Sequence, residues 1–356
     1  MAKLLEYLVW RGDVPLGHDG FNELDAAVLA RLSYLPFEHV PQERRQDGIS
    51  LGELTALLAE FPGVADAVIM PEDLDLCRQI SESDRFKEPV VRDYVCRWDS
   101  ESETQFSALS LILPDGRCCI VYRGTDDTLI GWKEDLNMGL TFPVPAQTSA
   151  VEFLEETDRR LGCQSYILCG HSKGGNLAVY AGAFCKPELQ EKVSMVYNFD
   201  GPGLDPAALE TEGYKRIAPR ILTFVPQFSV VGMLFGNARS YSPVRSDAFG
   251  ILQHNLYSWE IQGRGFLYAE ELDASSRMLD ASLDAWMREM GADEREALVE
   301  AVYQILTQNN AQTLDQLGEN RLENAALTLK TIRRLDPKTR ANALRAMQLL
   351  MRSLKT

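Results

Sequence analysis

The sequence predicts an α/β fold, with a mixed, mostly parallel β-sheet flanked by helices and an all-helical C-terminal extension. An apolar run, a tight Gly-rich turn and a helical run follow one another over Gln164 to Phe184, as a buried strand, turn and helix would. Two apolar segments are joined by Pro114-Asp115-Gly116, a turn so short that the strands must be antiparallel. From about Leu267 onward, only helical apolar spacing remains.

The composition narrows the functional classes. The chain has 356 residues, 45% of them hydrophobic, a net charge of -16 and a pI near 4.8. That charge argues against nucleic acid and against anionic membrane surfaces, since both attract basic patches. No apolar stretch approaches the ~20 residues of a membrane span, and the first residues do not resemble a signal peptide. We therefore expect a cytoplasmic protein without an integral membrane segment.

The cysteines and histidines do not suggest a metal site. There are seven Cys and four His, and the Cys lack the paired spacing of metal ligands. Cys118 and Cys119 are adjacent in a predicted strand and should face opposite ways. We expect small core thiols in a reducing compartment, no metal and no cofactor.

Residues 1–90 are predicted to be mostly helical, and no catalytic constellation lies there. Helices are indicated over Glu23 to Leu35, after a capping Ser50, and over Pro71 to Ile80. The following strands are expected over Val90 to Trp98, Gln105 to Leu113 and Arg117 to Arg123, and the last two, joined by the tight turn, should be antiparallel. Those near 165–169, 193–199 and 220–225 are separated by helical segments and should be parallel.

The turn at the centre of the chain carries a nucleophile motif. Gly170-His171-Ser172-Lys173-Gly174-Gly175 matches G-x-S-x-G, the elbow that holds a Ser in a strained turn so that Oγ projects over the sheet edge. Glycines are needed because a Cβ would clash with the adjoining strand and helix. The alternative is an ordinary strand-to-helix loop with a capping Ser.

A Ser hydroxyl needs a His base, and that base needs an orienting carboxylate. In folds with this elbow the base follows the nucleophile in the chain, which excludes His18 and His39. His171 adjoins Ser172, and its side chain should leave on another face. His254, just before a strand-like segment over Tyr257 to Ile261, is therefore the predicted base.

Three aspartates compete for the acid role. Asp200 directly ends the strand Val193 to Phe199, and open α/β sheets place their sites at such strand ends. It ranks ahead of Asp247, seven residues before His254, and of Asp205. A non-carboxylate orienter, or none, is the remaining alternative.

Two donors are predicted to hold a developing oxyanion. One is the backbone N–H of Lys173, the residue after the nucleophile. The other is Thr125, at the end of the strand beside the elbow. Thr125 could equally be the N-cap of a helix over Thr128 to Met138, and the two roles are compatible because both point donors at a helix start.

These residues resemble the class 3 lipase branch of the α/β hydrolases, the fungal-lipase-like group. The likeness covers roughly 90–262 and depends on three motifs: Arg123-Gly124-Thr125 with Trp132 and Asp135, the Ser172 elbow, and His254 with Tyr257-Ser258-Trp259. The chain looks closest to a bacterial, non-secreted offshoot. The resemblance implies Ser172 as nucleophile, His254 as base and Thr125 as oxyanion residue.

The sequence departs from that family at two places. Class 3 lipases carry the triad Asp in the loop after the next strand, but Val225 to Val231 contains none. Either Asp200 has taken over the task, or the triad is incomplete. Lys173 replaces the family's Leu and is expected to put a charge near the mouth of the site. The apolar loop 227–243 either walls an acyl site or packs in the core.

The predicted organisation is a hydrolase domain over 1–268, with a helical portion at 1–90 and a catalytic core at 90–262, then a helical extension over 269–356. The extension could be a cap, a surface for homo-oligomers or a protein-partner module. The favoured function is a serine hydrolase of carboxylic esters with a small-molecule acyl substrate. Alternatives are a thioesterase or peptidase on the same fold, or a catalytically silent scaffold that acts as a binding module.

Overall fold

The computed structural model describes residues 1–44, 48–99, 104–126, 141–234 and 240–274, and also 134, 137, 138, 276, 291, 293, 294, 297, 335–342 and 344. Its centre is an eight-stranded sheet whose strands lie in sequence order. The first four strands pair antiparallel, and the last five, from β4 onward, pair parallel. This confirms the predicted mixed sheet. The strands are β1 (Ile49–Ser50), β2 (Val90–Asp99), β3 (Thr104–Ile112), β4 (Cys118–Tyr122), β5 (Tyr166–His171), β6 (Val193–Phe199), β7 (Ile221–Pro226) and β8 (Ser242–Val244).

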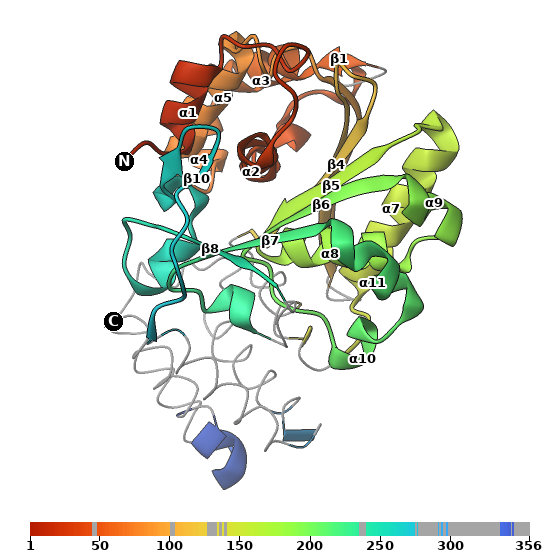
Figure 1. Cartoon of the computed structure of the whole chain (residues 1–356), viewed down its shortest axis with the longest axis vertical. Coiled ribbons are helices and arrows are strands. Elements are labelled where there is room, and N and C mark those ends of the chain that lie inside the picture. Colours follow the sequence, from red (N-terminus) through yellow and green to blue (C-terminus); the bar gives the residue numbers. More distant parts are fainter. Residues whose placement is uncertain are drawn as a thin grey trace.

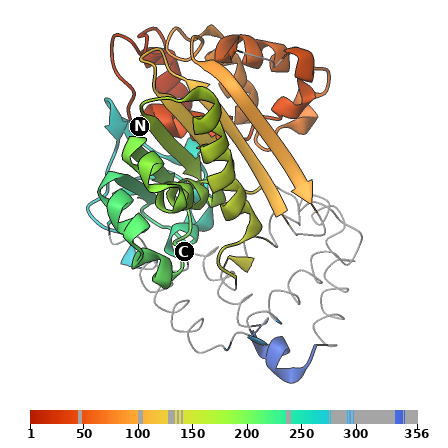
Figure 2. The ribbon, with the colours of Figure 1, turned by 90° about the vertical axis from the view of Figure 1, so that its right-hand side faces the viewer.

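Helices cover both faces of the sheet (Figures 1 and 2). The N-terminal helices lie on one face, and the helices that connect the parallel strands lie on the other. The first group is α1 (Leu4–Arg11), α2 (Glu23–Leu32), α3 (Leu51–Ala59), α4 (Val64–Ala67) and α5 (Glu72–Glu82). The second is α7 (Pro145–Leu161), α8 (Lys173–Phe184), α9 (Pro187–Lys192), α10 (Pro206–Leu209) and α11 (Glu212–Ile217).

Strand β4 shows how the two layers share the sheet. Cys118, Ile120 and Tyr122 belong to the core beneath α7 and α8. Cys119 and Val121 belong to the core beneath the N-terminal helices. Successive side chains of a strand point to opposite faces, so a strand covered on both sides reads as a continuous apolar run. The two cysteines face opposite ways, as predicted.

The N-terminal helical portion is anchored in the core by a buried ion pair. Arg85, which precedes β2, donates from Nε and Nη2 to the two carboxylate oxygens of Asp25 in α2, both at 2.6 Å. Its Nη1 also donates to the carbonyls of Val14 and Asp19. A buried charge pair is tolerated only when its remaining donors are satisfied. Residues distant in sequence are thereby fixed to one another.

The segment after β8 differs from its predicted strand. It forms two 3-10 turns, η5 (Gly250–His254) and η6 (Leu256–Ser258), and then a small hairpin of β9 (Ile261–Gln262) and β10 (Gly265–Phe266). The strand predicted over Tyr257 to Ile261 is therefore wrong at its start. The side chain of Asn255 accepts a hydrogen bond from the Tyr257 amide at 3.1 Å, which favours a turn over an extended chain.

Several predicted helices lie outside the described residues, apart from isolated positions. They are the helix over Thr128 to Met138 and most of the helical extension predicted over 269–356, and Trp132 and Asp135 also fall there. Within the described part, Asp336 caps helical residues 337–342 by accepting from the amides of Lys338 and Thr339 at 3.0 and 3.1 Å. None of the helices that the structure describes is both long and apolar enough to cross a bilayer.

Candidate active site

Ser172 occupies a sharp turn between β5 and α8. Its backbone has φ 57° and ψ -133°, a strained conformation for a residue with a side chain. The glycines permit it by close packing of main chain. A Cβ on Gly170 would lie 2.2 Å from the Gly174 carbonyl, and one on Gly174 would lie 2.1 Å from the main-chain carbonyl oxygen of Tyr122. The motif is therefore built as a nucleophile elbow, at the C-terminal edge of the parallel strands.

Asp200 ends the neighbouring strand β6 and contacts His254. Its side chain is fully buried and its φ is 49°. One carboxylate oxygen lies 2.7 Å from His254 Nδ1. The other accepts from the Ser229 hydroxyl at 2.5 Å and from the Gly232 amide at 3.2 Å. A carboxylate satisfied in this way can orient an imidazole so that Nδ1 carries the proton and Nε2 is free to accept one.

The other two aspartates lie elsewhere. Asp247 forms an ion pair with Lys3, and its side chain is half exposed. Asp205 caps α10, where its Oδ1 accepts from the Ala207 amide at 2.8 Å. Each therefore has a structural partner of its own, whereas Asp200 is the carboxylate hydrogen-bonded to His254.

The elbow and the acid are joined through the main chain. The Ser172 amide donates to the Phe199 carbonyl at 2.9 Å, directly before Asp200. A Cβ on Gly201 would lie 2.7 Å from the main-chain carbonyl oxygen of Ser172. In the part of the chain that the structure describes, no hydrogen bond joins Ser172 to His254. Catalytic hydrogen bonds are often long without substrate, so the grouping is compatible with a triad.

Thr125 follows β4 and lies beside the elbow. A Cβ on Gly174 would lie 2.9 Å from the Gly124 nitrogen, and one on Gly124 would lie 2.6 Å from the His171 carbonyl. The chain before Thr125 is thus packed against the turn that holds Lys173. The two predicted oxyanion donors therefore come from adjoining segments, and their role stays a prediction.

The side chain of Lys173 is not near the mouth of the site, contrary to prediction. It is 1% exposed and points into the protein. Its ammonium lies 2.9 Å from a Glu134 carboxylate oxygen and 2.7 Å from the Gln105 side-chain oxygen. Glu134 also accepts from the Ala146 amide at 3.0 Å. A buried Lys needs such partners, so this charge fixes the elbow in the core.

His171 forms contacts that the sequence did not indicate. Its Nδ1 lies 3.0 Å from the Tyr34 hydroxyl, and its Nε2 lies 2.8 Å from the His254 carbonyl oxygen. The two imidazole rings are 4.5 Å apart between centroids. Burial, together with the charges of His254 and Arg31, holds the pKa of His171 well below its usual value. The expectation that its side chain leaves on another face overlooked this contact.

Apolar side chains occur on both sides of the base. In the loop after β7, Phe228 and Met233 are buried, so that part of the loop packs in the core. Phe249 and Leu252, on either side of η5's first turn, are 79% and 66% exposed. They lie within five residues of His254, and exposed large apolar side chains at a site favour apolar ligands.

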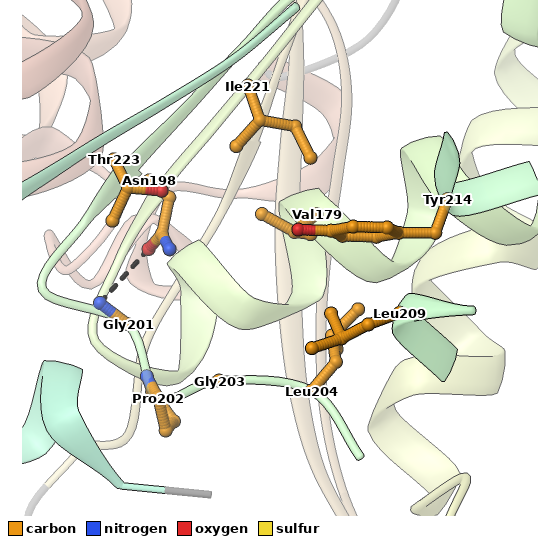
Figure 3. A pocket seen from close by; sticks show the side chains of 10 residues that line it. All are labelled: Val179, Asn198, Gly201, Pro202, Gly203, Leu204, Leu209, Tyr214, Ile221 and Thr223. Carbon is orange, nitrogen blue, oxygen red and sulfur yellow. Dashed lines mark hydrogen bonds between the residues drawn. The ribbon is translucent and has the colours of Figure 1, made fainter. Parts of the chain in front are cut away.

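A small cavity is lined in part by the chain from Gly201 to Leu204, which directly follows Asp200 in the sequence (Figure 3). The side chain of Asn198 accepts from the Gly201 amide at 3.0 Å. The volume is about 20 Å³, room for roughly one water molecule, so it is no acyl pocket. Among the described residues, no group of three His, Cys, Asp or Glu side chains could hold a metal ion. The cavity is lined by Val179, Asn198, Gly201, Pro202, Gly203, Leu204, Leu209, Tyr214, Ile221 and Thr223.

Comparisons with known proteins place the chain in context. A family model described as Mbeg1-like matches residues 80–304. The native Rhizomucor miehei lipase propeptide complex is similar at 14% identity and a TM-score of 0.38, over 63% of this chain and 68% of that one. M37 lipase is similar at 13% identity and a TM-score of 0.39, over 60% of this chain and 70% of that one. A Penicillium expansum triacylglycerol lipase is similar at 14% identity and a TM-score of 0.31, over 49% of this chain and 75% of that one. A comparison with curated proteins found no match.

Proposed function

This chain belongs to the Mbeg1-like family, and we propose that it is a serine hydrolase that cleaves carboxylic esters. The observation that carries the proposal is the 2.7 Å contact between His254 Nδ1 and Asp200, on the strand beside a strained Ser172 elbow. A protein that used the same fold only as a scaffold would not need a buried carboxylate aimed at a half-buried His. Asp200 thus supplies a carboxylate from the end of β6, whereas this chain has none over Val225 to Val231, where class 3 lipases carry theirs.

In the proposed reaction, Ser172 Oγ attacks the ester carbonyl while His254 Nε2 takes its proton. The Lys173 N–H and Thr125 stabilise the oxyanion of the tetrahedral intermediate. Its collapse breaks the ester C–O bond, and the imidazolium gives its proton to the leaving alcohol. Water, deprotonated by His254, then hydrolyses the acyl-enzyme and releases the acid. Asp200 orients the ring and stabilises the imidazolium.

An acyl or lipid-like substrate is proposed over a peptide. Phe249 and Leu252 are exposed and lie within five residues of His254 in the sequence, and burying each against an alkyl chain would gain about 25 cal/mol per Å² of apolar surface. A small-molecule acyl ester needs no cofactor. Thioesters and peptides react through the same groups and are the competing substrates. Cytoplasmic location and partner binding through the C-terminal extension stay predictions.

Fluorophosphonate labelling tests the proposal, because only an activated Ser reacts. We expect stoichiometric covalent labelling at Ser172, located by mass spectrometry, and hydrolysis of short and medium p-nitrophenyl esters. Both should vanish in Ser172→Ala. Ser194→Ala, which changes a serine at the far end of β6, is the matched control. If Ser172→Ala retains ester hydrolysis, or if the wild-type protein is not labelled, the proposal is wrong.

A substrate panel separates the remaining enzyme alternatives. Oxygen esters, thioesters and peptides of matched acyl length would be compared by kcat/KM. The proposal expects oxygen esters to lead, with values rising with chain length up to the reach of the apolar residues at η5. A preference for thioesters or peptides would keep the nucleophile but replace the substrate class.

A further inference from the structure

The contacts of His171 fix its proton. A carbonyl oxygen can only accept, so Nε2 must carry the hydrogen that bridges the 2.8 Å to the His254 oxygen. In the neutral ring Nδ1 is then an acceptor, and the Tyr34 hydroxyl at 3.0 Å is its donor. Burial lowers the pKa of His171 well below its usual value, which agrees with a neutral ring. The His254 carbonyl therefore sets the tautomer, and the Tyr34 hydroxyl satisfies the Nδ1 atom that this tautomer leaves as an acceptor.

His254 needs a second point of attachment. Its ring is fixed to Asp200 through Nδ1, but it belongs to a short 3-10 turn whose neighbour Leu252 is exposed. A single hydrogen bond allows the ring to swing about that bond. Holding the main chain at the His254 carbonyl removes this freedom, and displacements of about 1 Å can cost a reaction about 10²-fold.

The support extends into the N-terminal helical portion. Arg31 lies 4.5 Å over the Tyr34 ring and forms a buried two-point ion pair with Asp73, at 2.7 and 2.5 Å. Asp73 also accepts from the Tyr257 hydroxyl at 2.8 Å. Tyr257 follows His254 by three residues, so the base-bearing loop is held on both sides. These N-terminal residues precede the segment 80–304 that the family model matches.

Gly124 makes room for this arrangement. A Cβ there would lie 2.0 Å from the Tyr34 hydroxyl and 2.6 Å from the His171 carbonyl. The hydroxyl thus reaches His171 through space that any other residue would fill. At Gly124, the segment that leads to Thr125 therefore meets both the elbow, through His171, and the N-terminal helical portion, through Tyr34.

From these contacts we infer that His171 is a positioning residue for the base: its Nε2 hydrogen holds His254 in place through the main-chain carbonyl, while Tyr34 holds the His171 ring through Nδ1. This inference rests on the proposed hydrolase function. It gives the second residue of the elbow motif a task besides packing. It also makes the N-terminal helical portion part of the machinery.

Two substitutions of matched size test the inference. His171→Leu removes the donor, whereas His171→Gln keeps an N–H at about the reach of Nε2. We expect His171→Leu to lower kcat and the fluorophosphonate labelling rate about 10²-fold, with KM within about two-fold. His171→Gln should recover most of the loss, to within about five-fold of wild type. Tyr34→Phe, which removes the hydrogen-bond donor to His171 Nδ1, should fall between them.

Equal losses in the Leu and Gln variants, or a Leu variant with wild-type kcat, would overturn the inference. Crystal structures of the two variants give a readout that does not depend on activity. The His254–Asp200 contact should persist in His171→Gln and open in His171→Leu, and its persistence in both would be equally decisive against a positioning role. Failure of the hydrolase proposal would instead show as an unlabelled wild-type protein.

Discussion

Two neighbouring strands of this sheet end in residues with positive φ, and the two ends are built differently. At the end of β5, Ser172 is held by main chain packed on main chain, through glycines that leave no space for a Cβ. At the end of β6, Asp200 is held by hydrogen bonds, from the Ser229 side chain and the Gly232 amide. A residue held by close packing needs glycines beside it, and these form a motif that can be recognised in the sequence. A residue held by a hydroxyl from a distant segment has no such local pattern.

The largest effect is expected at the sterically fixed end. Gly174→Ala would place a Cβ 2.1 Å from the main-chain carbonyl oxygen of Tyr122, and a main-chain atom cannot move aside as the end of a flexible side chain can. We expect a loss of at least about 3 kcal/mol in unfolding free energy, or no soluble protein. Gly20→Ala, with nothing within 4 Å of the new Cβ, is the control. Urea unfolding of both variants measures it, and a stable Gly174→Ala would remove the steric account of the elbow.

The second effect is expected at the hydrogen-bonded end, on activity and not on folding. Asp200→Asn keeps the shape but no longer stabilises the working tautomer and charge of His254, so kcat should fall about 10³- to 10⁴-fold. Asp247→Asn, which changes the aspartate paired with Lys3, should leave kcat within about two-fold. Steady-state ester hydrolysis decides between them. A larger loss in Asp247→Asn would reassign the acid.

These two ends explain how much could be predicted. The elbow and the order of parallel and antiparallel strands could be predicted, because glycine spacing, turn length and apolar runs are local features. Asp200 could be ranked first only because parallel strands end at one edge. The contacts of His171 and the buried Lys173–Glu134 pair could not be predicted, since each depends on partners 39 to 137 positions away that share no pattern with it.

The segment after β8 shows the opposite error. Alternating aromatic and polar residues at Tyr257 to Ile261 predicted a strand, and a capping Asn255 turned its start into a 3-10 turn instead. A side chain that hydrogen-bonds its own main chain can outweigh a propensity of less than about 1 kcal/mol. This turn directly follows His254, so the element that was predicted wrongly adjoins the site in the sequence.

A third prediction concerns the support of Asp200. Ser229→Ala removes the 2.5 Å bond to one carboxylate oxygen and leaves the Gly232 amide as its partner. We expect kcat to fall about ten-fold and the unfolding free energy to drop by about 1.5–3 kcal/mol, the contribution of one hydrogen bond to a charged group. Ser194→Ala also loses one hydroxyl bond, to the Tyr166 carbonyl, but has no link to the acid. Unchanged kcat in Ser229→Ala would mean that the acid end is also fixed sterically.

The smallest effect is expected on the pH dependence of stability, through His171, which directly precedes Ser172 and contacts the His254 carbonyl oxygen. Its pKa in the folded protein lies well below the ordinary 6.5 because of burial. Below pH 6.5 the unfolded chain therefore binds a proton at this residue that the folded chain does not. The unfolding free energy then decreases as the pH is lowered, by up to about 1.4 kcal/mol per pH unit from His171. Above pH 6.5 His171 is neutral in both the folded and the unfolded chain, and its contribution to the pH dependence vanishes. His171→Gln should flatten this slope, whereas the exposed His18→Gln should keep it. Urea unfolding at pH 7.5, 6.5 and 5.5 provides the comparison, and equal slopes in wild type and His171→Gln would mean that His171 takes up its proton in the fold.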